Sequence, residues 1–195
     1  MDKPSSEARE RVLEVAERLF MERGYAAVTL KDISEALGIK QASLYYHFPK
    51  GKEEMFVNVA ERSFGRHRIG LETAIQNAGS DLREQLRAIA RWLFSQAPMD
   101  FGRMMRSDMP SLTQEQSARL EHLAYESLLA PLESLFAAAR KARLIWSDHP
   151  SLAAGTIIAI LNAIHNLPEH YDAPPKLLMA EEAIEIFLNG ILVRR

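Results

Sequence analysis

A short run of hydrogen-bonding side chains between Gly38 and Lys52 carries the chemistry that stands out in this sequence. It contains a glutamine, a serine, two tyrosines and a histidine, its lysines include Lys40 and Lys50, and no acidic residue lies among them. Amide and hydroxyl groups can bond to base edges in the DNA major groove, and lysines can neutralise phosphates. From the residues alone the alternative is a surface helical hairpin, because helix-turn-helix spacing also arises by chance.

Two short helices joined by a tight turn are expected to hold these side chains. Thr29 followed by Asp32 has the spacing of a capping box, so a helix should start there. Gly38 suits the left-handed position that ends a helix, and Ile39 is expected to enter the core. A second helix follows, with Leu44 on its inner side. The polar and aromatic residues then lie on the outer face of this second helix.

The stretch GYAAVTLKDISEALGIKQASLYYHFPKGKEEMF resembles the N-terminal signature of TetR-family transcriptional regulators. There are two departures from the family pattern. Lys40 stands where a small hydroxyl residue is usual, and Lys50 with Gly51 makes the loop after Phe48 one residue longer than the commonest form. The matching residues are Gly24, Tyr25, Thr29, Ile33, Ala36 to Ile39, Leu44, Tyr45, His47, Phe48, Lys52 and Glu53.

The resemblance implies an all-α chain with an N-terminal three-helix DNA-binding head, which contains the helix-turn-helix, and a six-helix regulatory and dimerisation body. We place the head at residues 1–52 and the body at residues 53–195. The implied function is sequence-specific DNA binding by a transcriptional regulator, most often a repressor that an apolar or amphipathic small molecule releases. The implied partners are double-stranded DNA with a pseudo-palindromic operator, a second copy of the chain and a small-molecule effector.

The contacts to DNA are assigned on the second helix and its flanks. The residues expected to reach base edges are Gln41, Ala42, Ser43 and Tyr46. Those expected to contact phosphates are Thr29, Lys40, Tyr45, His47 and Lys52.

Apolar residues at helical spacing predict helices through the rest of the chain. Gly65 and Gly70 weaken the helix that begins near Lys52, and we interpret them as tolerated surface positions in preference to hinges. Pro131 should kink a long helix or mark its restart. The expected helices run from about Ser6 to Gly24, Lys52 to Ala78, Asp81 to Ala97, Thr113 to Arg143, Asp148 to Ile164 and Lys176 to Leu192.

A methionine-rich segment follows Pro98. Methionine adapts to varied apolar shapes, so this segment could form the wall of a ligand pocket, although ordinary core packing is the simpler explanation. Arg103, Arg106 and Asp108 could add polar anchors, but charges of this kind usually lie on a solvated loop. The candidate ligand-lining residues are Phe94, Met99, Phe101, Met104, Met105, Tyr125, Leu128 and His165.

The two C-terminal helices resemble the pair that forms dimers in TetR-like proteins. Residues 153–164 are almost entirely apolar, which predicts burial of one side of that helix in the chain's own core and of the other against a partner subunit. Small residues spaced by four allow a second helix to approach closely. The candidate interface residues are Gly155, Ala159, Ala163, Ile184, Phe187 and Leu188.

Composition excludes several other classes of function. The chain has 195 residues, a net charge of −2 and no cysteine, so a nucleic-acid site must be a local patch and thiol chemistry is absent. The histidines lack metal-binding spacing and no catalytic motif is present, so we expect no enzyme activity, cofactor or metal. No apolar run is long enough to span a membrane and the N-terminus lacks a signal-peptide core, which predicts a cytoplasmic protein. The carboxylates of Glu181, Glu182 and Glu185 are expected on a solvated face.

Two other hypotheses remain. The first is a helical dimeric protein-interaction module without a specific operator, which would bind DNA weakly and without regard to sequence. A more remote one is a small helical enzyme or lipid carrier, which no catalytic constellation supports.

Overall fold

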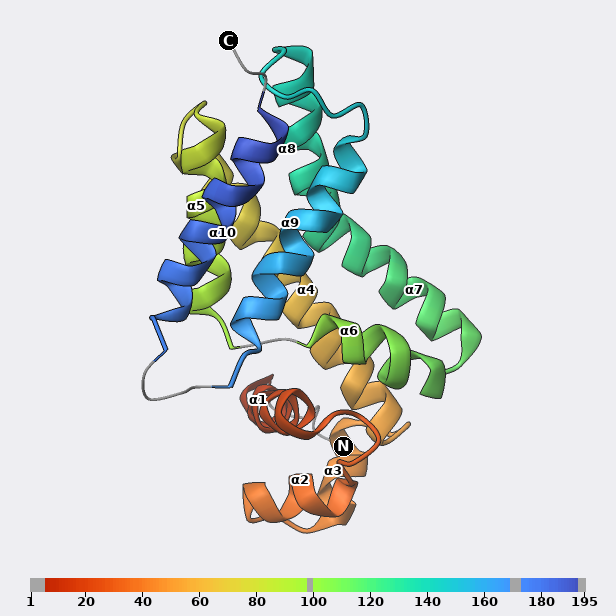
Figure 1. The fold of residues 1–195 in the computed structure, drawn as a ribbon. Coiled ribbons are helices and arrows are strands. Elements are labelled where there is room, and N and C mark those ends of the chain that lie inside the picture. The colour runs from red at the N-terminus through yellow and green to blue at the C-terminus, as the bar shows by residue number, and fades with distance from the viewer. Residues whose placement is uncertain (1–5, 98–99, 169–172, 193–195) are drawn as a thin grey trace. The chain divides into compact units, whose positions relative to one another are not determined.

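The computed structural model describes residues 6–97, 100–168 and 173–192, and in these ranges it is helical apart from loops and one isolated bridge between Ile145 and Leu192. The predicted all-α class is confirmed. The helices are α1 Ser6–Arg23, α2 Leu30–Leu37, α3 Gln41–His47, α4 Lys52–Asn77, α5 Leu82–Ser95, α6 Phe101–Arg103, α7 Gln114–Ala124, α8 Ala130–Lys141, α9 Pro150–His165 and α10 Lys176–Ile191 (Figure 1). Shorter π-helical and 3₁₀ turns cover Met104–Asp108, Met109–Ser111 and Tyr125–Leu129.

The chain folds into two compact units, and their limits differ from the linear division expected at residue 52. The first unit combines Met1–Ser63 with Asp100–Leu123, and the second combines Phe64–Met99 with Ala124–Arg195. The unit boundaries therefore fall inside α4 and at the end of α7. The segment from Asp100 to Leu123 joins the head because its side chains bind the head directly, as described below.

The first unit is built on α1, α2 and α3, with α1 packed on α2 and α2 on α3. Its apolar interior includes a cluster of three rings. The ring centres of Phe20 and Phe56 lie 5.3 Å apart in an edge-on arrangement, and the Tyr25 ring lies 4.8 Å from that of Phe56. The other side chains of this core that are almost fully buried are Val12, Ala16, Leu19, Val28, Ile33, Leu44, Phe48 and Met55.

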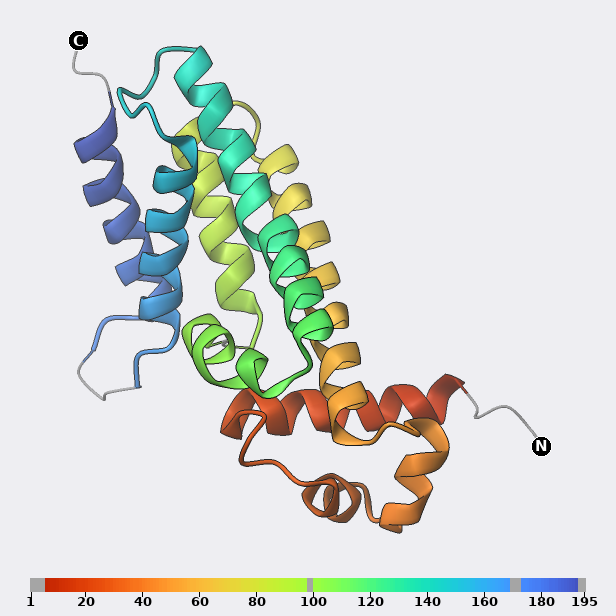
Figure 2. The ribbon, with the colours of Figure 1, turned by 90° about the vertical axis from the view of Figure 1, so that its right-hand side faces the viewer.

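The second unit is a helical bundle in which α10 packs against α5 and α9, and α9 packs against α8 (Figure 2). Buried Ile89, Phe136, Ile157, Ile184 and Leu188 form its interior. Of the carboxylates predicted on a solvated face, Glu182 is exposed, but Glu181 and Glu185 are half-buried and paired with arginines. Glu185 on α10 forms ion pairs with both Arg83 and Arg87 of α5, and Glu181 lies 3.9 Å from Arg91. These pairs join the two helices.

Pro131 interrupts the regular α-helix, as predicted. Proline lacks the amide hydrogen of an α-helix and its ring crowds the preceding turn. The helical chain from Gln114 to Lys141 accordingly widens into a π-helical turn at Tyr125–Leu129 and resumes as α8, with the proline in the first turn. The predicted kink is therefore a π-bulge.

The prediction that both glycines of α4 are tolerated surface positions is wrong for Gly70. A Cβ atom built on Gly70 would lie 2.0 Å from the Trp92 ring, so α4 and α5 approach here only because the residue has no side chain. Gly65 has nothing within 4 Å of such an atom, and it alone fits the original interpretation. In the ranges that the structure describes, no helix combines the length and the apolar character that a membrane crossing needs.

Candidate nucleic-acid interface

The first helix of the motif begins at the predicted cap. The Thr29 hydroxyl accepts a hydrogen bond from the amide of Asp32 at 3.1 Å, and the Asp32 carboxylate accepts one from the amide of Thr29 at 2.7 Å. The hydroxyl of Thr29 also donates to that carboxylate, and this bond lowers the pKa of Asp32 below its usual value. The capping box fixes where α2 starts.

The turn between α2 and α3 follows the prediction in its backbone but not in its side chains. Gly38 has φ +68°, the left-handed conformation expected at the helix end. The amide of Ile39 donates to the carbonyl of Ser34 at 3.0 Å, yet its side chain is 39% exposed. The prediction that Ile39 enters the core is wrong. The interior beneath the turn is occupied by Ile33 and Leu44, both fully buried, so the turn residue faces outward.

Helix α3 presents a polar and aromatic surface over an apolar base. Leu44 and Phe48 are fully buried on its inner side. Tyr45 and Tyr46 are 47% and 48% exposed. The other predicted base-edge residues, Gln41, Ala42 and Ser43, are also exposed, as are Lys40 and Thr29.

Lys40 and His47 lie at the two ends of α3. Lys40 occupies the N-cap position and its side chain makes no capping bond, in keeping with the departure from the family pattern. The half-buried His47 ring meets the Tyr46 ring edge-on, with centres 5.3 Å apart. Its Nδ1 atom is buried and has no hydrogen-bond partner among the described residues.

Lys52 is held by the protein itself. Its ammonium donates to the carbonyl oxygens of Tyr25 at 2.8 Å and of Val28 at 2.9 Å. It also lies 4.1 Å from the centre of the Tyr25 ring. Burial lowers the pKa of Lys52, and the Asp108 carboxylate opposes that shift. Of the residues predicted to contact phosphate, Lys52 is therefore the one whose charged group is already occupied.

The connection between α1 and α2 is also held from the segment that begins at Asp100. The Asp108 carboxylate accepts a hydrogen bond from the amide of Tyr25 at 3.0 Å. The Arg103 guanidinium donates to the carbonyls of Phe20 at 3.1 Å and Met21 at 2.8 Å, at the end of α1. The expectation that Arg103 and Asp108 lie on a solvated loop is wrong, because both bind the head.

Gly24 makes this approach possible. It ends α1 with φ +83°, a conformation that favours glycine. A Cβ atom at this position would lie 3.3 Å from Nε of Arg103 and 3.4 Å from a carboxylate oxygen of Asp108. The glycine of the family signature thus leaves room here for two charged side chains.

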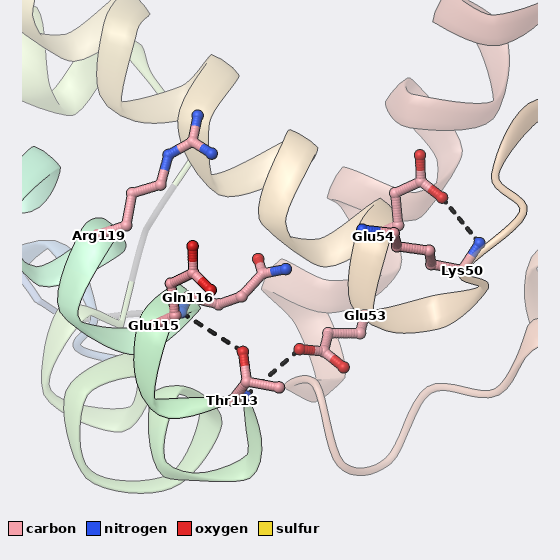
Figure 3. Close-up of a pocket in the computed structure, with 7 residues that line it drawn as sticks. All are labelled: Lys50, Glu53, Glu54, Thr113, Glu115, Gln116 and Arg119. Atoms are coloured by element: carbon pink, nitrogen blue, oxygen red, sulfur yellow. Dashed lines mark hydrogen bonds between the residues drawn. The ribbon is translucent and has the colours of Figure 1, made fainter.

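A polar pocket of about 420 Å³ lies between the start of α4 and the start of α7, inside the first unit (Figure 3). The Glu53 carboxylate accepts a hydrogen bond from the amide of Thr113 at 3.3 Å, and Glu54 accepts one from the amide of Lys50 at 2.9 Å. No sequence signal predicted this pocket, because the two helix starts meet only in the folded chain. Its lining residues are Lys50, Glu53, Glu54, Thr113, Glu115, Gln116 and Arg119.

The candidate ligand-lining residues are divided between the two units. Phe94 and His165 stack with ring centres 4.6 Å apart, and Leu128 is buried in the same unit. Tyr125 is 43% exposed and its hydroxyl donates to Glu133. Met104 is buried and Met105 half-buried in the first unit, whereas Met99 and the side chain of Phe101 lie outside the described residues. None of these residues lines the polar pocket.

The candidate dimer residues fall in two layers. Ala159 and Ala163 are exposed, and Gly155 and Phe187 are half-buried. Ile184 and Leu188 are buried in the chain's own core, so they do not reach the surface. One side of α9 is buried in the chain's own core through Ala153, Ala154, Ile157 and Leu161, while Leu152 on its other side is 64% exposed. Burial of that other side by a partner subunit stays a prediction.

No group of acidic, histidine or cysteine side chains in the described ranges could hold a metal ion. The hydrogen-bonding face of α3 and the lysines near it form the candidate interface. The chain is thus an all-α protein of the helix-turn-helix class, in which a capped helix-turn-helix is followed by a helical bundle.

Comparisons with known proteins give the family. Residues 12–59 match the family described as "Bacterial regulatory proteins, tetR family". The HTH-type transcriptional repressor KstR2 of Mycolicibacterium smegmatis is 40% identical over 79 residues, which is 37% of this chain and 38% of that protein. The regulator IcaR of Staphylococcus epidermidis is 43% identical over 56 residues, 29% of this chain and 30% of that protein. The aligned parts thus span well under half the length of these relatives.

Solved structures extend the likeness in fold to nearly the whole chain. The structure of KstR2 of Mycobacterium tuberculosis has a TM-score of 0.73 and 20% identity, and covers 98% of both chains. That of AibR, solved with isovaleryl coenzyme A and operator DNA, has a TM-score of 0.76 and 20% identity, covering 91% of this chain and 96% of AibR. Residues 12–59 thus match the tetR family of bacterial regulatory proteins, and the fold of nearly the whole chain is that of the solved structures.

Proposed function

We propose that the protein is a sequence-specific DNA-binding transcriptional regulator that acts in the cytoplasm as a repressor. The observation that carries the proposal is the capped helix-turn-helix, whose α3 exposes Gln41, Ser43 and Tyr46 above a fully buried Leu44. A short helix fixed in this way can enter the major groove, where amides and hydroxyls read base edges. The relatives named as transcriptional repressors support the same function.

Phosphate contacts would fix the head on the duplex without reading its sequence. Thr29, Lys40 and Tyr45 are exposed around α3. Lys40 and Tyr45 supply a cation and a hydroxyl, whereas the Thr29 hydroxyl already bonds Asp32 in the capping box. His47 follows at the end of the helix. These residues remain our assignment for phosphate binding, and the part played by Lys52 is considered below.

A second copy of the chain would bind through α9 and α10. Besides Ala159 and Ala163, this part of the chain exposes three large apolar side chains: Leu152 at 64%, Leu178 at 55% and Ile186 at 69%. Exposed apolar residues on adjacent helices favour burial against a partner. A two-fold dimer would bind a pseudo-palindromic operator with half-sites about one helical turn apart. Ile184 and Leu188 would support this surface from beneath.

A small apolar or amphipathic effector would release the operator by favouring a conformation whose heads no longer match it. Such a ligand can shift the equilibrium only by its difference in affinity for the two conformations. AibR, which shares this fold, was solved in complex with isovaleryl coenzyme A and operator DNA, and this supports the proposal of a small-molecule effector. In this chain the stacked pair of Phe94 and His165 is the aromatic surface that we assign to it.

The test is a selection of genomic fragments by the purified full chain, followed by fluorescence anisotropy at about 150 mM salt, where nonspecific binding is weak. We expect a selected fragment to bind at least ~10³-fold more tightly than a scrambled duplex of equal composition. Equal and weak binding to both would contradict a specific operator. It would instead favour the protein-interaction module, whose head docks on a protein.

A further inference from the structure

Lys50 and Lys52 flank Gly51 at the start of α4, and their ammonium groups differ in their hydrogen bonding. The Lys52 ammonium binds the carbonyls of Tyr25 and Val28 and lies over the Tyr25 ring. The Lys50 side chain is exposed, and among the residues that the structure describes its ammonium has no hydrogen bond or ion pair.

We propose that the two lysines have separate roles in DNA binding, an inference that rests on the proposed function. Lys52 is a positioning residue that holds the connection between α1 and α2. Lys50 supplies the phosphate contact at the start of α4. This assignment departs from the one that the sequence suggested, in which Lys52 contacts the phosphate.

The contacts of Lys52 show why it is unsuited to a phosphate contact. An ammonium group has three N–H donors, and two of them are used by backbone carbonyls. The aromatic face of Tyr25 holds the cation on another side. Moving this group to a phosphate would leave the carbonyls of Tyr25 and Val28 unpaired in a partly buried place, which is costly.

The connection that Lys52 holds leads directly into the helix-turn-helix. Val28 is followed by Thr29, the N-cap of α2, and α3 follows α2 through the tight turn at Gly38. The bonds from Lys52 to Tyr25 and Val28 therefore fix the start of α2 relative to α4. Loss of these bonds would alter the placement of α3 without removing a charge from the DNA-facing surface.

The backbone places Lys50 beside α3. Gly51 has φ +70°, and a Cβ atom built on it would lie 3.6 Å from the Tyr45 ring and 3.7 Å from Leu30. The turn thus packs next to Tyr45, which we assign to phosphate binding. The amide of Lys50 donates to the Glu54 carboxylate, which fixes its backbone, and its side chain is exposed at the rim of the polar pocket.

Neither Glu53 nor Glu54 forms an ion pair with the Lys50 ammonium among the described residues. Glu53 is directed at the amide of Thr113 and Glu54 at the amide of Lys50, as Figure 3 shows. Both negative groups are thus held by backbone donors around the polar pocket. Lys50 is the exposed cation next to the α4 N-terminus, where a phosphate also gains from the unpaired amides of the first turn.

The experiment compares the wild type with Lys50→Gln, Lys52→Gln and the control Lys141→Gln, an exposed lysine at the end of α8. Binding of a fluorescent random-sequence duplex is measured between about 20 and 200 mM salt, since each phosphate contact contributes about 0.9 to the slope of log Kobs against log salt. We expect Lys50→Gln to reduce that slope by about 0.9 for each head, with an unchanged melting temperature. We expect Lys52→Gln to keep the slope but to lower the melting temperature, and the control to change neither.

The reverse result, a reduced slope with unchanged melting for Lys52→Gln and an unchanged slope for Lys50→Gln, would overturn the division of roles. A reduced slope in both variants would overturn the positioning role of Lys52. If Lys52→Gln does not fold, Lys52→Met keeps the stem against Tyr25 and carries the slope measurement. A wild type that binds no duplex would refute the proposed function itself, whereas a wild type that binds, with the reverse pattern in the variants, would refute only the roles of the lysines.

Discussion

The amide of Tyr25 donates a hydrogen bond of 3.0 Å to the carboxylate of Asp108, which lies 83 residues further along the chain. On the other side of the same residue, the carbonyl of Tyr25 accepts a bond from Lys52. One peptide unit on each side of Tyr25 is therefore bound by a charged side chain. This arrangement makes the methionine-rich segment a structural part of the head.

Asp108→Ala should destabilise the first unit by about 1–3 kcal/mol, because it leaves the amide of Tyr25 without its buried acceptor. Chemical denaturation followed by circular dichroism measures the effect. Asp148→Ala, which removes an exposed carboxylate on the second unit, is the control and should change little. An Asp108→Ala protein as stable as the wild type would show that the contact contributes nothing to the fold.

Gly70→Ala and Gly65→Ala should have opposite effects although both lie in α4. The new methyl group at Gly70 would overlap the Trp92 ring, so we expect a loss of about 1–3 kcal/mol from overpacking. At Gly65 there is open space, and alanine should add up to about 1 kcal/mol through its helix propensity. The free energies of unfolding of the two variants are compared in one denaturant series, and equal effects would contradict the close approach of α4 and α5.

Gln41→Ala should relax base preference at one position of the selected operator, with a loss of about 1–3 kcal/mol there. Lys40→Ala should instead weaken binding to operator and random DNA alike, because a phosphate contact carries no sequence information. Anisotropy titrations on the operator, its single-base variants and a scrambled duplex distinguish the two. Equal losses on all duplexes for Gln41→Ala would remove it from the base-reading set.

Ile186→Asp should convert a dimer into monomers while leaving the chain folded, since Ile186 is 69% exposed in the single chain and lies on the proposed interface. Sedimentation velocity over a range of concentrations measures the association. Ile69→Asp is a matched control, because Ile69 is 68% exposed on α4. Dimers of unchanged strength in Ile186→Asp would place the interface elsewhere.

The second unit should lose stability in mild acid because of His165. Burial, and then the positive charges of Lys176 and His67, lower the pKa of His165 below its ordinary value of 6.5. The unfolded chain therefore binds a proton more readily than the folded one, so this contribution is complete above pH 6.5 and is lost as the pH falls below it. His165→Gln should flatten the fall in melting temperature between about pH 7 and pH 5, and an unchanged pH profile would contradict the assignment.

The backbone of the helix-turn-helix could be predicted from the sequence because the residues that determine it act locally. The Thr29 to Asp32 box, the left-handed Gly38 and the buried Leu44 each act within a few residues of themselves. Ile39 was misplaced because its environment depends on which other side chains fill the space beneath the turn. Periodicity also placed the long helices, since apolar spacing reports which face of a helix is buried.

The contacts between distant segments were beyond any sequence pattern. Nothing local to Arg103 or Asp108 indicates that they bind the end of α1, and nothing at Gly70 indicates Trp92 of the next helix. The same holds for Glu185, which pairs with arginines on α5. Such pairings depend on how helices approach one another in the folded chain.

The sequence by itself therefore determined the helical class, the helix-turn-helix and the match of residues 12–59 to the tetR family, because these follow from local spacing and a specific motif. The tertiary structure decided which lysine ammonium group is already hydrogen-bonded within the protein. Lys50 and Lys52 are two residues apart and chemically identical, and sequence reasoning chose Lys52 for the phosphate. Only the folded chain shows the Lys52 ammonium bound to the carbonyls of Tyr25 and Val28, since those acceptors come from a connection more than twenty residues earlier.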